Sequence, residues 1–149
     1  MTELMWKLRV AVLWIFLGVV GAFGAALLLY EPGTVRDMMR GEIQGAALGT
    51  AQVQLATQVL VPLGMAFITV AVSDYRANRT VNGVLGVLYA ASALIALVLF
   101  SDPLAFGGVL AFIGVTLSLV SLLLLWHVWK WPVPGRVASS AHEGPAIRR

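Results

Sequence analysis

The chain has 149 residues, of which 60% are hydrophobic and only 11% are charged, and it contains no cysteine. So few charges cannot cover the surface of a water-soluble domain of this size, and the high hydrophobicity excludes a disordered chain. The missing cysteines exclude disulfides, thiolate metal sites and cysteine nucleophiles. Long uncharged apolar segments instead predict an integral membrane protein.

Four uncharged segments, residues 10–30, 46–72, 81–100 and 104–126, are each long enough to cross a bilayer. A membrane-spanning helix needs about 20 residues, and backbone groups in lipid must be satisfied within the segment. None of the segments alternates as a membrane strand does, so helices are predicted. The expected fold class is all-α, a polytopic four-helix transmembrane bundle that forms one domain over residues 1–131.

The connection over residues 31–45 is the longest, and it predicts a short helix. Thr34 and Asp37 have the spacing of a capping box. Apolar and basic residues then fall on different faces of this helix: Val35, Met38 and Met39 on one, Arg36 and Arg40 on the other. This pattern is typical of an amphipathic helix on the outer membrane surface. Residues 132–149 contain three prolines and few apolar side chains, which predicts a disordered cytoplasmic tail.

The basic residues predict the orientation of the bundle. Eight of the ten lie at the two termini and in the connection that holds Arg76 and Arg79, all on one side of a four-span chain. The positive-inside rule places that side, with both termini, in the cytoplasm. The prevalence of Arg, Ala and Gly suggests a bacterial source, so the predicted location is the bacterial plasma membrane. Because the basic residues adjoin apolar segments, they indicate lipid headgroups rather than nucleic acid as partners.

Small residues form ridges on the first, third and fourth segments, beginning at Gly18 and Gly21, at Gly83 and Gly86, and at Gly107. Helices in lipid pack closely through small residues. The ridges therefore predict packing within the bundle, or self-association of copies of the chain.

The second segment carries an unusual polar face. Gln44, Gln54, Gln58 and Pro62 share one side of a helix, with Thr57 beside them. Pro62 has no N–H to donate, so the carbonyl of Gln58 is left without its helical partner. Two interpretations stay open. The amides hydrogen-bond neighbouring helices, or they line a cavity that opens outward with Glu42, Gln44 and Asp102 at its mouth.

The connection between the second and third segments holds a second polar cluster. Asn78 and Asn82 are four residues apart, as are Tyr75 and Arg79, so each pair shares a helix face. Asn78, Arg79 and Asn82 could bind a phosphate or a lipid headgroup. In the structural alternative, Asp74 caps the third helix and the arginines determine topology.

With these residues the chain resembles a family of uncharacterised small four-span bacterial membrane proteins, described as DoxX-like. The resemblance covers residues 8–131, and its most distinctive part is the Asn78-Arg79-x-x-Asn82 turn. Leu60 stands where the family often has Glu, two residues before the proline. The other matching positions are Leu13-Trp14-Ile15-Phe16, Gly41-Glu42-Ile43-Gln44, Pro62 with Met65, Tyr75-Arg76, and Trp126-x-x-Trp129-Lys130-Trp131. The resemblance implies the four-span fold and no particular activity.

The distribution of titratable residues narrows the functions. The four segments contain no Asp, Glu, Lys, Arg or His, which disfavours proton-coupled transport and haem binding. His127 and His142 lie on the inner side and most acids on the outer side, so neither a metal site nor any cofactor is expected.

Two functions remain. The first is a non-enzymatic binder of a lipid or another amphipathic molecule, or an accessory membrane subunit, with self-association as an open possibility. The second is a membrane-embedded isomerase, cyclase or epoxide-opening enzyme acting on an isoprenoid, quinone or polyketide. Glu42 would be its acid or base, with Asp102 next, and Gln44, Gln54 and Gln58 would orient the substrate.

Overall fold

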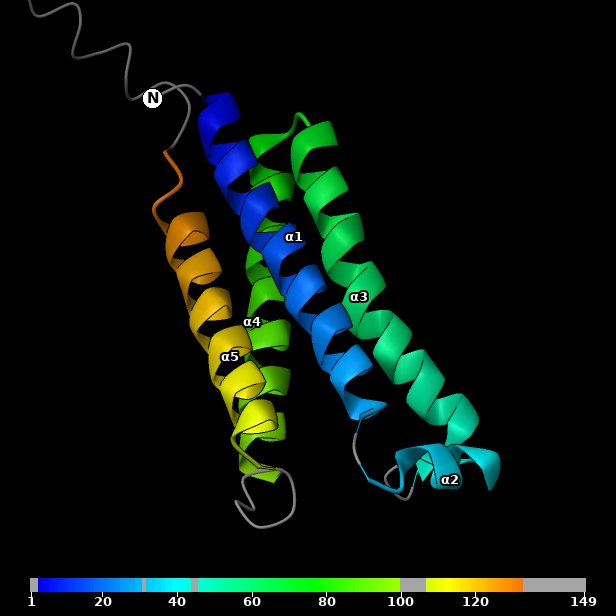
Figure 1. Ribbon diagram of the computed structural model, residues 1–149. Coiled ribbons are helices and arrows are strands. Elements are labelled where there is room, and N and C mark those ends of the chain that lie inside the picture. The colour runs from blue at the N-terminus through cyan, green and yellow to red at the C-terminus, as the bar shows by residue number, and fades with distance from the viewer. Residues whose placement is uncertain (1–2, 31, 44–45, 100–106, 133–149) are drawn as a thin grey trace, which may run out of the picture.

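The computed structural model describes residues 3–30, 32–43, 46–99 and 107–132. The regular secondary structure of these residues is helical apart from one very short strand pair. Four long helices run beside one another, and a short helix lies across one end (Figure 1). The helices are α1 (Glu3–Leu28), α2 (Thr34–Met39), α3 (Leu48–Ala71), α4 (Tyr75–Leu99) and α5 (Gly107–Trp129). We call the end that holds the start of α1 the proximal end, and the other the distal end.

The all-α prediction is confirmed, and two helices are long and apolar enough to cross a membrane. These are α1 over residues 3–27 and α5 over residues 112–129. Both α1 and α4 begin several residues before the predicted segments, which started at positions 10 and 81. The difference arises because an uncharged segment marks only the apolar part of a helix, whereas the helix continues through charged turns. The predicted tail after residue 132 and the start of the last segment at 104 lie outside the described residues.

The short helix in the first long connection is confirmed, but its predicted capping box is wrong. Thr34 is the first helical residue and is buried, and the residue before it, Gly33, makes no side-chain cap. Gly33 has a φ of 97°, a left-handed conformation that glycine adopts without strain. A strand pair that the sequence did not predict follows: β1 (Glu42–Ile43) is antiparallel to β2 (Ala46–Ala47).

Small residues bring the long helices into close contact, as the glycine ridges predicted. A Cβ placed on Gly21 of α1 would lie 3.0 Å from the carbonyl oxygen of Gln58 on α3. One placed on Gly86 of α4 would lie 2.9 Å from a side-chain carbon of Leu124 on α5. These glycines therefore pack against helices of the same chain.

The main cluster of buried apolar side chains lies in the proximal half of the bundle and joins all four long helices. Its members are Val10, Ala11, Trp14, Leu17, Met65, Ala66, Tyr89, Leu124, Val128 and Trp131. The polar network and the apolar groove described next both adjoin this cluster.

Candidate functional site

A buried hydrogen-bond network centres on Asn82 of α4. Its Oδ1 accepts a hydrogen bond of 2.6 Å from the indole Nε1 of Trp14 on α1. The hydroxyl of Thr69 on α3 lies 2.9 Å from the same oxygen and 2.7 Å from the carbonyl of Met65, so its single proton has two acceptors. Trp14, Thr69 and Asn82 are all 0% exposed. One side-chain amide thus joins three helices.

Asn78, one helical turn before Asn82, completes this network. Its Nδ2 donates to the carbonyls of Thr69 and Val72 at 2.8 and 3.2 Å. Its backbone carbonyl and its Oδ1 accept from Nδ2 of Asn82 at 2.9 and 2.7 Å. All four amide protons of the asparagine pair therefore have acceptors within the protein, as buried polar groups require. The ligand-binding role of Asn78 and Asn82 stays a prediction, and the geometry shows their part in joining the helices.

Lys7 is a buried cation that extends the network to the end of α3. Its Nζ donates to the carbonyl of Val72 at 2.9 Å, and Val72 is the C-cap of α3. The carboxylate of Glu3 lies 3.2 Å from the same nitrogen. A positive charge is favourable at the C-terminus of a helix, where the backbone carbonyls lack helical partners. From the sequence, Lys7 was only one of the N-terminal basic residues that predict the orientation of the bundle.

Tyr75 and Arg79 connect the start of α4 to the end of α5. The Tyr75 hydroxyl donates to the carbonyl of Trp131 at 3.0 Å and accepts from Arg79 Nη1 at 3.0 Å. Arg79 Nη2 donates to the carbonyl of Trp129, also at 3.0 Å. Two guanidinium donors are thus used inside the protein, and the headgroup role of Arg79 stays a prediction.

Asp74 caps the start of α4, as predicted. Its Oδ1 accepts a hydrogen bond of 2.9 Å from the backbone N–H of Ala77 in the first turn. This contact supplies a partner for one of the backbone donors at the start of the helix.

Pro62 creates a contact between α3 and α4. The Tyr89 hydroxyl donates a hydrogen bond of 2.6 Å to the carbonyl of Gln58, the group that Pro62 leaves without its helical donor. Pro62 is fully buried. The sequence indicated the free carbonyl, but it did not indicate that a tyrosine 31 residues away would bond it.

The structure brings few of the other predicted site residues together. Glu42, Gln52 and Thr57 are exposed, and Gln58 is half-buried. The Thr57 hydroxyl donates to the carbonyl of Val53 in its own helix at 2.8 Å. Gln44, Asp102 and the side chain of Gln54 lie outside the described residues. The glutamine-lined cavity and the acid–base role of Glu42 and Asp102 stay predictions.

An apolar groove of about 380 Å³ lies between α1 and α5 near the proximal end. It is lined by Met5, Leu8, Arg9, Val12, Leu13 and His127. The Trp6 ring lies 5.7 Å from the His127 ring, and the Arg9 guanidinium carbon lies 5.7 Å from the Trp6 centroid. Four of the six lining residues are apolar, and the other two, Arg9 and His127, carry nitrogen-bearing polar groups.

The groove was not predicted from the sequence, although one face of α1 carries a signal for it. Met5, Leu8, Arg9 and Val12 have the i, i+3, i+4, i+7 spacing of one helix face. That spacing shows which side chains lie together but not which helix faces them.

Among the described residues, no three histidine, aspartate or glutamate side chains gather as metal ligands would. No protein-family model, curated protein or solved structure matches this chain.

Proposed function

We propose that the chain is a four-span protein of the bacterial plasma membrane that binds a lipid or another amphipathic molecule and does not transform it. The observation that carries this proposal is the groove between α1 and α5. It offers an apolar surface with Arg9 and His127 as polar groups, which suits a ligand with an apolar chain and a polar end.

The four-span topology has support from the helices themselves. α3 and α4 have 24 and 25 residues, long enough to cross the same bilayer beside α1 and α5. Large apolar side chains are exposed on all four long helices, for example Phe23, Phe67, Leu88 and Phe112. A surface of this kind is stable against lipid tails and unfavourable against water. The resemblance to the DoxX-like four-span family agrees with this arrangement.

The orientation has support from the charges of the proximal end. Five basic and two acidic residues lie there among the described residues: Lys7, Arg9, Arg76, Arg79 and Lys130, against Glu3 and Asp74. An excess of basic residues is typical of the cytoplasmic side. Both termini are therefore cytoplasmic in the proposed topology.

Single cysteines test this orientation, because the natural chain has none. Arg40, directly after α2, and Arg76 of α4 are both exposed, and they fall on opposite sides of the proposed membrane. In intact cells, a membrane-impermeant thiol reagent should label Arg40→Cys and leave Arg76→Cys unlabelled until the cells are opened. Labelling of both variants in intact cells would contradict the proposed topology.

Ligand binding is tested with the full chain purified in mild detergent. Native mass spectrometry should detect a bound amphipathic molecule, and Val12→Trp should displace it by filling the groove. Val19→Trp is the matched control, since Val19 is also exposed on α1 but does not line the groove. An empty natural protein, or equal ligand retention by the two variants, would refute the proposal.

A further inference from the structure

We infer that the ligand of the groove is an anionic phospholipid, whose acyl chain lies along α1 and whose phosphate is held by Arg9 and Lys130. This inference rests on the proposed function and adds the charge class of the ligand. It depends on three observations: a cation without a carboxylate partner beside the groove, a second cation on the same side, and the apolar lining.

Arg9 is the first cation, and its charge is not neutralised within the described residues. The ion pairs there join Lys7 to Glu3 and Arg40 to Asp37, and Arg9 takes part in neither. The guanidinium group is exposed and near the ring of Trp6, at 5.7 Å from its centroid. A guanidinium group can donate two parallel hydrogen bonds to a phosphate, which makes arginine a specific phosphate ligand.

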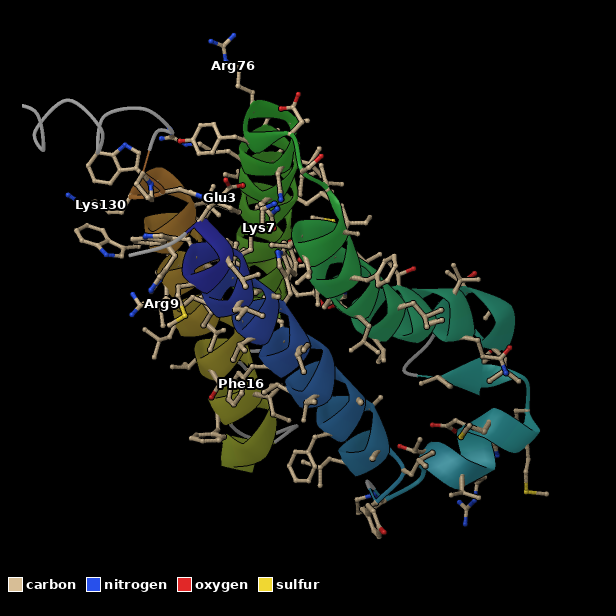
Figure 2. All side chains as sticks on the ribbon, turned by 90° about the horizontal axis from the view of Figure 1, so that it is seen from above. Glu3, Lys7, Arg9, Phe16, Arg76 and Lys130 are labelled. Carbon is tan, nitrogen blue, oxygen red and sulfur yellow. The ribbon has the colours of Figure 1, made fainter. Side chains whose placement is uncertain are left out.

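Lys130, directly after α5, is the second cation. Figure 2 shows Arg9 and Lys130 extending on the same side of the molecule, whereas Arg76 points in a different direction. The ammonium group of Lys130 lies 5.1 and 5.0 Å from the ring centroids of Trp126 and Trp129. These contacts hold the charge beside two tryptophans, a residue type that is enriched at membrane–water interfaces.

The contacts of Lys130 with the two tryptophans favour an anionic headgroup over a zwitterionic one. A zwitterionic lipid carries its own cation a few bonds from the phosphate, and that cation offsets the attraction of Arg9 and Lys130 for the phosphate. Trp126 and Trp129 already bind the Lys130 ammonium, so a second cation there would meet a like charge. An anionic headgroup such as phosphatidylglycerol has no such cation, and its net charge complements Arg9 and Lys130.

The apolar part of the lipid has a matching surface. Met5, Leu8, Val12 and Leu13 form the lining of the groove along α1. Its volume of about 380 Å³ lies within the range of roughly 300–1,000 Å³ found for small-molecule sites. Met5, Leu8 and Val12 are all more than 40% exposed, so an acyl chain laid on them would cover apolar surface.

Competition between two lipids tests the inference. The full chain in mild detergent is mixed with equal amounts of phosphatidylglycerol and phosphatidylcholine, and bound lipid is measured by native mass spectrometry. We expect the natural protein to bind mainly phosphatidylglycerol. Arg9→Gln and Lys130→Gln should each lower that affinity about fivefold, the effect of one basic residue near an anionic headgroup.

Arg76→Gln is the matched control, because Arg76 is an exposed proximal cation outside the groove. It should leave the preference unchanged, and circular dichroism should show that all three variants keep their helices. Equal binding of both lipids, abolished by Val12→Trp, would overturn the inference while upholding the proposed function. An equal loss of phosphatidylglycerol affinity in Arg76→Gln would also overturn the inference, since the general surface charge would then explain the preference. Binding of neither lipid, with the groove occupied by a second copy of the chain, would overturn both.

Discussion

Thr69 and Thr57 of α3 have the same local geometry and opposite surroundings. Each hydroxyl lies within 2.8 Å of the carbonyl four residues earlier in its helix. Thr69, near the proximal end, is 0% exposed and also contacts Asn82, whereas Thr57, in the distal half, is exposed. A polar side chain in an apolar helix therefore joins helices only where a neighbouring helix brings a partner, and otherwise it bonds its own backbone.

The proximal and distal halves of the bundle differ in the same way. At the proximal end, four buried polar side chains from three helices hydrogen-bond one another: Trp14, Thr69, Asn78 and Asn82. The described polar side chains on the distal half of α3, by contrast, are exposed or half-buried. Polar side-chain contacts should therefore contribute to stability mainly at the proximal end, and substitutions can test this contrast.

Asn82→Leu should have the largest effect, because it leaves the Trp14 N–H and the Asn78 side-chain oxygen without their partner. We expect a loss of about 2–3 kcal/mol in the free energy of unfolding, since each buried unsatisfied group costs about 1–3 kcal/mol. Reversible unfolding in detergent, followed by circular dichroism, measures this loss. Combining Asn82→Leu with Trp14→Phe should cost less than the sum of the two, and strict additivity would argue against a shared network.

Gly21→Leu should come next, because its side chain would collide with the backbone of α3 at Gln58. Overpacking of this kind typically costs about 1–3 kcal/mol. Gly64→Leu is the control, since a Cβ at Gly64 of α3 meets no atom within 4 Å. The same unfolding assay should show a loss for Gly21→Leu alone, and equal losses would contradict the close approach of α1 and α3.

Tyr89→Phe should cost about 0.5–1.5 kcal/mol, the usual net contribution of one hydrogen bond. The substitution removes the hydroxyl that donates to the Gln58 carbonyl, and Pro62 has no N–H to replace that donor. Pro62→Ala restores the helical N–H donor to that carbonyl. In the Pro62→Ala background, Tyr89→Phe should therefore cost measurably less in the same unfolding assay. An undiminished cost would show that the tyrosine acts through packing.

Thr69→Val and Thr57→Val should have the smallest effects and should still differ. We expect about 1 kcal/mol at Thr69, where a buried contact to Asn82 is lost. At Thr57 the change should stay within about 0.5 kcal/mol, as is usual for exposed positions. Comparing the two unfolding midpoints checks the contrast directly, and a larger loss at Thr57 would reverse our assignment of stability to the proximal end.

Several features were predictable from the sequence because their causes are local. Charge-free length predicted the helices, the spacing of Val35 and Met39 predicted α2, and Asp74 was recognisable as a cap. Gly21 was identified as a packing position because close helix approach in lipid needs small residues. The capping box at Thr34 failed because Gly33 starts α2 through its left-handed backbone conformation, without a side-chain bond.

The candidate site was predictable only in part. The spacing of Asn78 and Asn82 showed that they share a helix face, and Pro62 showed that the Gln58 carbonyl needs a donor. Their partners Trp14 and Tyr89 lie on other helices, and no periodicity connects them. The groove was missed for the same reason, since its α1 residues are ordinary apolar side chains until α5 is placed opposite them.

The sequence by itself was enough to predict the all-α class, the apolar parts of the long helices and the uneven distribution of the charges. These properties follow from composition and from the short-range geometry of a helix. The tertiary structure alone decided which polar groups meet and where an apolar surface stays open, because both depend on how α1, α3, α4 and α5 approach one another. The buried polar contacts therefore centre on the asparagine network at the proximal end, near the groove, whereas Gln52 and Gln58 of α3 are exposed and half-buried.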